Sequence, residues 1–200
     1  MGIRALLVGV LLAMSSAAQS AVVTLAPAST TLASGDSVAV EVLVSGLDVG
    51  QALAGFDLDL IYDPAVLSAR SVTFGAALGE DGLDLFSTSV LSAGRVDLAA
   101  VSLLAELDLL ALQAASFSIA TLVFDALAPG VSDVRFDLAT FPGLLLSDAF
   151  GVAIAASVGG ETSITVTGGG AVPSPGSLAL VTLALALALA RSRRTHSRAH

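Results

Sequence analysis

An alternation with a period of two residues, present in two segments, is the feature that most constrains the fold. In "SVAVEVLVSG" (37–46) every second residue from 38 to 44 is a valine, with Ala39, Glu41 and Leu43 between them. In "AGFDLDLIYD" (54–63) positions 56, 58 and 60 are phenylalanine or leucine, with Asp57, Asp59 and Ile61 on the opposite face. Alternate side chains of a β-strand point to opposite faces of a sheet, so both segments are predicted to be half-buried strands.

Shorter apolar segments recur along the chain and are separated by turn sequences such as "ASGDS", "YDPA", "APG" and "VGGE". We predict further strands at residues 22–25, 66–74, 95–103, 117–126, 132–138, 152–156 and 163–166. The segment "LLAELDLLALQAAS" (103–116) is rich in leucine and alanine and predicts one or two helical turns. Many short strands with regular turns indicate an all-β sandwich, formed by a single domain at residues 21–167.

The N-terminal residues 1–20 have the pattern of a secretory signal peptide. Arg4 supplies a positive start, an apolar stretch follows from Ala5 to Met14, and "SSAAQSA" offers small residues for cleavage. The apolar stretch is too short for a comfortable membrane span, which favours a cleaved signal over a permanent anchor. We therefore expect the chain to be exported.

A second apolar segment follows a short linker, residues 168–171, near the C-terminus. A helix from Pro175 to Ala190 would be about 24 Å long, against a bilayer core of about 30 Å. Arginines follow it at Arg191, Arg193 and Arg194, and such a cluster usually stays on the cytoplasmic side. This pattern predicts a short transmembrane helix that places the preceding domain outside the inner membrane.

Charge is distributed unevenly along the chain. All 17 acidic residues lie between Asp36 and Glu161, where Arg70, Arg95 and Arg135 are the only basic residues, so this part carries a net charge of −14. A domain of this charge repels nucleic acids and anionic lipid surfaces. We expect no nucleic acid among its partners.

The residue types needed for common catalytic sites are absent from the predicted domain. The two histidines are His196 and His200, in the basic tail, and the chain has no cysteine. Ser-His-Asp and Cys-His catalysis and ordinary zinc sites are therefore excluded, and stability must come from core burial without disulfides. No glycine-rich phosphate loop is present, and we predict no cofactor and no enzymatic activity.

Carboxylates are the remaining candidates for chemistry. Asp57 and Asp59 share one strand face, and Asp63 follows in the "YDP" turn. Such a cluster could bind Ca²⁺ or supply the acid pair of a glycosidase. The alternative is a solvated strand face that ends in a turn, with Asp63 capping the turn at Pro64. A second acidic loop, "LGEDGLD" (78–84), lacks the ligand spacing of an EF-hand.

The predicted domain resembles cohesin domains in several segments taken together. These are "LASGDSVAVEVLVSGL", "ALAGFDLDLIYDPAVLSARSVTFG", "FSIATLVFDALAPGVSDVRF" and "LSDAFGVAI", and the resemblance as a whole covers about residues 22–166. The resemblance implies a nine-stranded β-sandwich of jelly-roll topology, related to carbohydrate-binding modules. Cellulosomal cohesins bind dockerin modules through one sheet face, and no residue-by-residue match to that face is found here.

The C-terminal segment "VPSPGSLALVTLALALALARSRR" resembles the PEP-CTERM sorting signal of Gram-negative bacteria. The usual motif is Val-Pro-Glu-Pro, an apolar helix and an arginine cluster, whereas this chain has Val172, Pro173, Ser174 and Pro175. The resemblance implies that an exosortase cleaves near the motif and that the product moves to the cell surface or extracellular matrix. Ser174 in place of glutamate leaves open which exosortase reads the motif.

These observations favour an exported, surface-sorted binding or structural module without catalysis. The expected partners are an exopolysaccharide or another surface protein, apart from the exosortase that processes the chain. Two alternatives stay open. One is a carbohydrate-active enzyme that uses Asp57 or Asp59 with Asp63, and the other is a receptor for dockerin-type modules.

Overall fold

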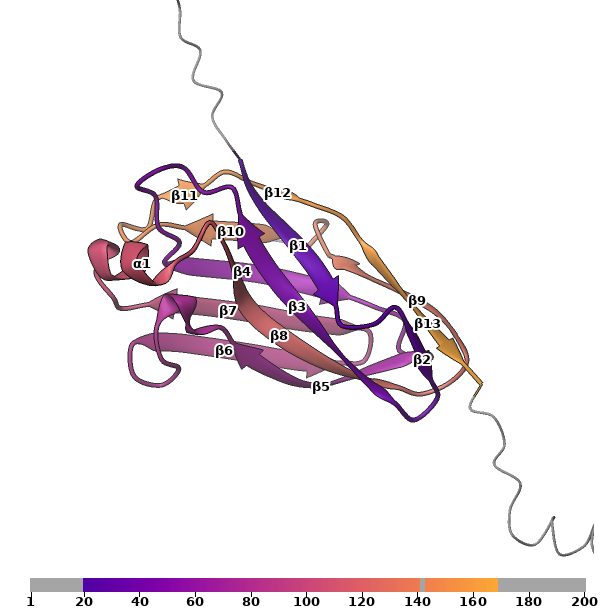
Figure 1. Cartoon of the computed structure of the whole chain (residues 1–200). Coiled ribbons are helices and arrows are strands. Elements are labelled where there is room, and N and C mark those ends of the chain that lie inside the picture. The colour runs from indigo at the N-terminus through magenta and orange to yellow at the C-terminus, as the bar shows by residue number, and fades with distance from the viewer. Residues whose placement is uncertain (1–19, 141–142, 169–200) are drawn as a thin grey trace, which may run out of the picture. The chain divides into compact units, whose positions relative to one another are not determined.

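The structure, a computed structural model, describes residues 20–140 and 143–168. These residues form two β-sheets that pack face to face (Figure 1), and the compact unit ends at Thr167. The predicted sorting motif, the predicted membrane helix and nearly all of the predicted signal peptide lie outside the described residues. Within the described ranges, no helix combines the length and the apolar character needed to span a membrane.

Thirteen strands are described, divided between the two sheets. The five-stranded sheet has the order β12 (Ala156–Val158), β1 (Ala21–Pro27), β3 (Ser37–Ser45), β8 (Ser116–Ala126), β5 (Leu67–Phe74). The eight-stranded sheet has the order β11 (Ala153–Ile154), β10 (Leu144–Ser147), β4 (Gly55–Ile61), β9 (Gly130–Phe136), β13 (Thr162–Thr167), β2 (Thr31–Ala33). In this second sheet β7 (Arg95–Ser102) also pairs with β4, and β6 (Leu85–Ser92) pairs with β7.

The core lies between the sheets and follows directly from the alternation in the sequence. Val40 and Val42 of β3 and Leu122 of β8 face Leu58 of β4 and Leu98 of β7, and all five are fully buried. Each such side chain contributes roughly 1.5–3 kcal/mol when it leaves water. The predicted all-β sandwich is confirmed.

The first two strands of the domain pair with the last two. β1 pairs in parallel with β12, through Val22 and Ser157 among others, and β2 pairs in parallel with β13, through Leu32 and Val166. Parallel pairs need long connections, and here nearly the whole domain lies between the partners. Both sheets are thus completed only by the C-terminal strands.

The strand number differs from the nine implied by the family resemblance. The predicted strand 152–156 is divided into β11 and β12, because the chain crosses there from one sheet to the other. Three strands, β2, β6 and β10, were not predicted. The helix predicted within residues 103–116 is confirmed as α1 (Glu106–Leu112).

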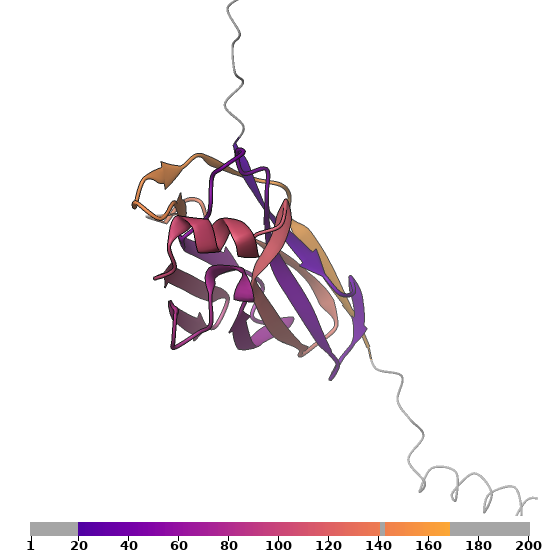
Figure 2. The same cartoon turned by 60° about the vertical axis from the view of Figure 1, so that its left-hand side comes forward.

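One end of the sandwich is covered by α1 and by the single-turn helix η1 (Ala76–Leu78), as Figure 2 shows. Leu109 of α1 is fully buried and packs with Ala52 and Ala54 in a small apolar cluster separate from the main core. The strands β5 and β7 both end at this side of the domain, and β8 begins there.

Arg95, the first residue of β7, joins three segments of the eight-stranded sheet. Its Nε and Nη2 donate to the two carboxylate oxygens of Asp59 on β4, at 3.1 and 2.6 Å. Its Nη1 donates to Asp137 and to Thr140, in the loop after β9, at 3.1 Å each. The hydrogen bond from the Thr140 hydroxyl is the main cause that lowers the pKa of Asp137, and Ala139 and Arg95 lower it further.

Removal of Arg95 tests this cluster. Asp59 is only 3% exposed, so Arg95→Ala leaves a buried carboxylate without its cation. We therefore expect the free energy of unfolding to fall by about 2–3 kcal/mol. Arg70→Ala is the matched control, because Arg70 is 59% exposed in its pair with Asp125 and exposed pairs contribute about 0–1 kcal/mol. Urea denaturation measures the free energy of unfolding of both variants, and an equal decrease in the two would contradict a structural role for Arg95.

Candidate binding face

The outer face of strands β6, β7 and β4, with the neighbouring β10, carries the side chains best placed to meet a partner. Because the inward positions of these strands build the core, their alternate positions point to solvent. The outward residues of this binding face are Phe86, Thr88 and Val90 on β6, Asp97, Ala99 and Val101 on β7, Asp57 on β4 and Leu145 on β10.

An apolar patch occupies the part of the face nearest α1. Phe86 and Val101 lie directly opposite each other on β6 and β7, and they are 64% and 57% exposed. Val90 and Leu145 are also exposed on the same face. Large apolar side chains that gather on one sheet face indicate an interaction surface more strongly than single exposed residues do.

Acidic residues lie beside this patch. Asp59 and Asp97 are directly opposite each other on β4 and β7, and Asp57 is two residues from Asp59 on the same face. Arg95 neutralises Asp59, but none of the described residues forms an ion pair or a side-chain hydrogen bond with Asp57 or Asp97. Partial burial raises the pKa of Asp57, and the charges of Asp97 and Asp59 raise it further.

The three predicted carboxylates have different surroundings. Asp63 lies in the turn after β4, where its side chain accepts a hydrogen bond from the Ala65 amide at 2.8 Å. Asp59 is buried against Arg95, so the expected solvated strand face holds for Asp57 but not for Asp59. Among residues 20–140 and 143–168, no group of three or more histidines and carboxylates is arranged to hold a metal ion. A Ca²⁺ site at Asp57, Asp59 and Asp63 stays a prediction.

The exposed apolar residues of this face were not predicted from the sequence. In "LFSTSVLS" (85–92) the outward positions hold Phe86 and Val90 with Thr88 and Ser92, while the inward positions hold Leu85, Ser87, Ser89 and Leu91. Both faces of the strand therefore mix apolar and polar residues, and no period of two marks one face as buried. The local pattern identifies neither β6 nor the binding face.

The face can bind but offers little for catalysis. Its apolar part can be dehydrated by a partner, and Asp57 and Asp97 provide uncompensated negative charge next to it. A complementary surface would therefore bring apolar side chains flanked by lysine or arginine. The rigid strand backbone fixes these groups before a partner arrives, which lowers the entropic cost of binding.

The raised pKa of Asp57 leads to a prediction on stability. The pKa of Asp57 in the folded state is higher than its ordinary value of 3.8, so folding favours the protonated form. At a pH above the folded-state pKa, the ionised carboxylate lowers the stability of the fold. This destabilisation disappears as the pH falls through the folded-state pKa to below 3.8. Asp57→Asn is expected to raise the midpoint of thermal unfolding at pH 7, with no difference well below pH 3.8. Glu161→Gln, on an exposed loop, is the control for net charge. Equal shifts for both variants, or a shift that persists in acid, would contradict this account.

Solved structures with the same fold are cohesins. A type II cohesin domain from the cellulosome of Acetivibrio cellulolyticus is 21% identical, with a TM-score of 0.59 over 72% of this chain and 95% of that chain. A mutant type II cohesin–X-dockerin complex from the same organism gives 19% identity and a TM-score of 0.59, over 74% and 99% of the chains. A non-cellulosomal cohesin from Archaeoglobus fulgidus is 12% identical, with a TM-score of 0.52 over 74% of this chain and 91% of that chain.

At these identities the structural likeness establishes the fold alone. No curated protein resembles the sequence closely enough to count as a match. The sequence model of the cohesin domain, however, matches residues 22–138, which is more than half of the chain. The matched segment includes β6, β7 and β4, and thus most of the binding face. The chain belongs to the cohesin domain family.

Proposed function

We propose that this chain is an exported, non-enzymatic module that binds a partner protein through the outer face of β6, β7 and β4. The observation that carries the proposal is the exposed Phe86–Val101 pair next to the uncompensated carboxylates Asp57 and Asp97. An apolar centre bordered by unpaired charge is the usual composition of a specific protein interface.

Each part of the face has a defined role in this proposal. Phe86 and Val101 form the dehydrated centre, because side chains of this size provide most of the binding energy when a partner covers them. Asp57 and Asp97 attract a lysine or arginine of the partner and orient it. Burial is the main cause that raises the pKa of Asp57, and a cation placed there relieves the repulsion from Asp97 and Asp59 that raises it further.

The proposed partner is a module of the dockerin type. One of the similar cohesin structures is part of a cohesin–X-dockerin complex, which supports this choice. An exopolysaccharide suits the face less well, since sugars stack on flat aromatic rings and the chain has no tryptophan and a single, buried tyrosine, Tyr62. The carbohydrate-active enzyme is not favoured either, because Asp59 is already paired with Arg95.

The localisation proposal rests on the two ends of the sequence. Residues 1–20 direct export, the helix 175–190 holds the chain in the inner membrane for a time, and an exosortase cleaves near Val172–Pro175. The domain then reaches the cell surface or extracellular matrix of a Gram-negative bacterium.

Binding is tested with single charged substitutions on the sheet. Phe86→Asp is expected to weaken binding to an immobilised dockerin module about 100-fold, because a central apolar anchor contributes on the order of 2–3 kcal/mol. Val131→Asp is the matched control, since Val131 is 58% exposed on β9 of the same sheet but outside the binding face. Surface plasmon resonance with the X-dockerin of Acetivibrio, and with dockerin modules encoded near this gene, gives the affinities.

The proposal fails if Phe86→Asp and Val131→Asp bind equally well, or if the wild-type chain binds no dockerin module and no surface protein of its host. Thermal unfolding of both variants checks that the fold is retained.

Sorting is tested in the native host with a tagged full chain. The tagged domain should be released to the surface or medium in cells that contain the exosortase and should stay in the inner membrane when the exosortase gene is deleted. Replacement of Pro173 and Pro175 by alanine should reproduce the deletion. Identical fractionation in all three strains would rule out exosortase sorting.

A further inference from the structure

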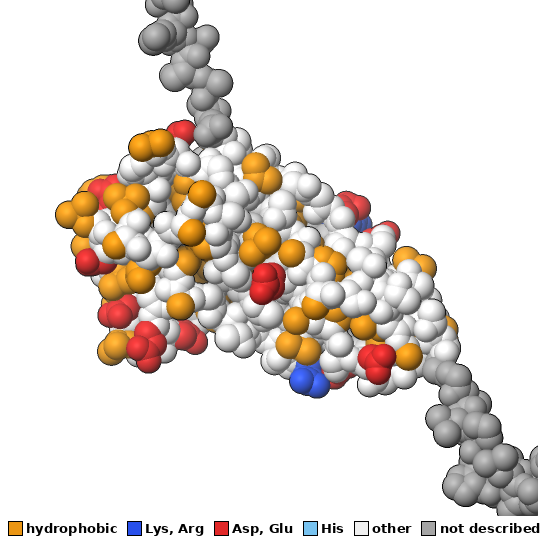
Figure 3. Space-filling model, in the orientation of Figure 1, with side chains coloured by type: hydrophobic (Ala, Val, Ile, Leu, Met, Phe, Trp, Pro, Cys, Tyr) orange, Lys and Arg blue, Asp and Glu red, His pale blue; other side chains and the backbone are white. Residues whose placement is uncertain are grey.

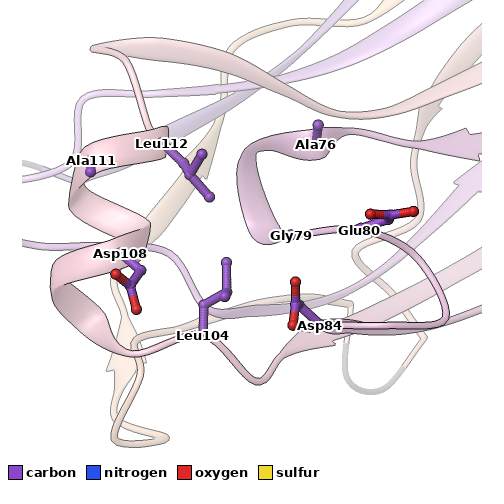
Figure 4. Close-up of a pocket in the computed structure, with 8 residues that line it drawn as sticks. All are labelled: Ala76, Gly79, Glu80, Asp84, Leu104, Asp108, Ala111 and Leu112. Atoms are coloured by element: carbon purple, nitrogen blue, oxygen red, sulfur yellow. The ribbon is translucent and has the colours of Figure 1, made fainter.

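A groove lies between η1 and α1, at the end of the sandwich, and is separate from the outer sheet face. It has a volume of about 630 Å³ and a mostly apolar interior, to which Leu104, Leu112 and Ala76 contribute. Figure 4 shows Leu104 and Leu112 pointing into the space between the two helical segments. Glu80 and Asp84, on the acidic loop between η1 and β6, and Asp108, on α1, line the groove beside this apolar floor.

The walls of the groove are held in place by hydrogen bonds. The Nε2 of Gln113, just after α1, donates to the Ala77 carbonyl of η1 at 3.2 Å and to the Leu53 carbonyl at 2.6 Å. Its Oε1 accepts from the Leu53 amide at 2.9 Å. The Leu103 amide donates to the Asp84 carbonyl at 2.7 Å, which ties the floor to the acidic loop. The groove is therefore formed before any ligand arrives.

The charge of the groove is not compensated by the domain itself. Among the described residues, no arginine forms an ion pair with Glu80, Asp84 or Asp108, and the three ion pairs of the domain involve Arg70 and Arg95 only. The same described residues contain no cluster arranged to hold a metal ion. Unpaired carboxylates around an apolar floor match a cation that carries its own apolar stem.

The surface around the groove has the same mixed character. Leu83, Leu103 and Leu107 are exposed beside it. Figure 3 shows apolar and acidic side chains gathered at this end of the domain, on the left of the view. A second copy of this chain is a poor occupant, because the domain between Asp36 and Glu161 carries a net charge of −14 and would repel an identical end.

The groove is also remote from the point where the chain leaves the domain. The Thr167 carbonyl accepts a hydrogen bond from the Ser34 amide, and the neighbouring Gly35 amide donates to Ala126 at the end of β8. The groove lies near the start of β8, and a strand of 11 residues spans about 35 Å. Within the domain, the groove and Thr167 therefore lie toward opposite ends of β8.

We propose that the groove binds a basic, amphipathic segment of a partner protein, at a site distinct from the sheet face. A lysine or arginine side chain lies along Leu104 and Leu112 with its methylene groups, and its charge lies among Glu80, Asp84 and Asp108. Leucines of the same segment cover Leu103 and Leu107. The site goes beyond the proposed dockerin-type binding and does not depend on it.

The probe for this site is a short peptide of alternating leucine and lysine, added to the full chain in non-ionic detergent micelles. The groove variant Glu80→Gln with Asp108→Asn is expected to bind the peptide about tenfold more weakly, because it loses two charge contacts. The matched control is Glu41→Gln with Glu161→Gln, which changes the net charge equally at exposed positions elsewhere. Leu112→Asn should weaken binding about fivefold through the lost apolar contact.

The location of binding is read from amide NMR shifts. Binding of the peptide should shift the backbone amide resonances of Gly79, Leu104 and Ala111 and leave the amide resonance of Val131 unchanged. All variants have the same C-terminal segment and are measured in the same detergent. The fraction of peptide that enters the micelles is therefore the same for each variant. Phe86→Asp should leave the peptide-induced shifts of Gly79, Leu104 and Ala111 unchanged, so binding at the groove is distinguished from binding at the sheet face.

If the groove variant and its control lose peptide affinity equally, the peptide is attracted only by the net negative charge of the domain, and the proposal is overturned. Spermidine that produces the same shifts and displaces the peptide would overturn the assignment to a protein segment, since a free polyamine would then be the occupant.

Discussion

The structure depends on burying aliphatic side chains between two sheets in a chain without cysteine. The inward positions of β3, β8, β4 and β7 are committed to this core, and it has no disulfide to replace lost burial. Across the described residues, every buried side-chain nitrogen or oxygen has a hydrogen-bond partner. The interior of the described residues therefore offers no unpaired buried polar side chain to a ligand, and both proposed binding sites use the surface: outward strand positions and the end covered by α1.

The alternation of residues allowed most of the sandwich to be predicted, but only where it coincided with burial. β3 and β4 were found because their apolar residues face the core. β6 was missed because each of its faces mixes apolar and polar residues. Phe86 and Val90 face water, while Ser87 and Ser89 face inward beside the buried Leu85, so the pattern marks neither face as buried. β2 and β10 have three and four residues, which is too short for a period of two to be distinguished.

The acidic residues of the site could be named from the sequence, but their partners could not. Asp59 looked like its neighbour Asp57, yet Arg95, which is 36 residues away, takes Asp59 into a buried pair and leaves Asp57 in an unpaired, partly buried position. The difference depends on the pairing of β4 with β7, which brings residues together that no local pattern connects. The groove between η1 and α1 has the same origin, because it requires the Gln113 contacts to two distant segments.

The pairing of β1 with β12 and of β2 with β13 also has a consequence for the order of folding. A chain that emerges from its N-terminus holds β1 and β2 without their parallel partners until almost the last residue of the domain is made. Such long-range pairing makes folding slow, since the entropy of closing the loop is lost before the contacts form. During synthesis both sheets thus stay incomplete until β12 and β13 have been made.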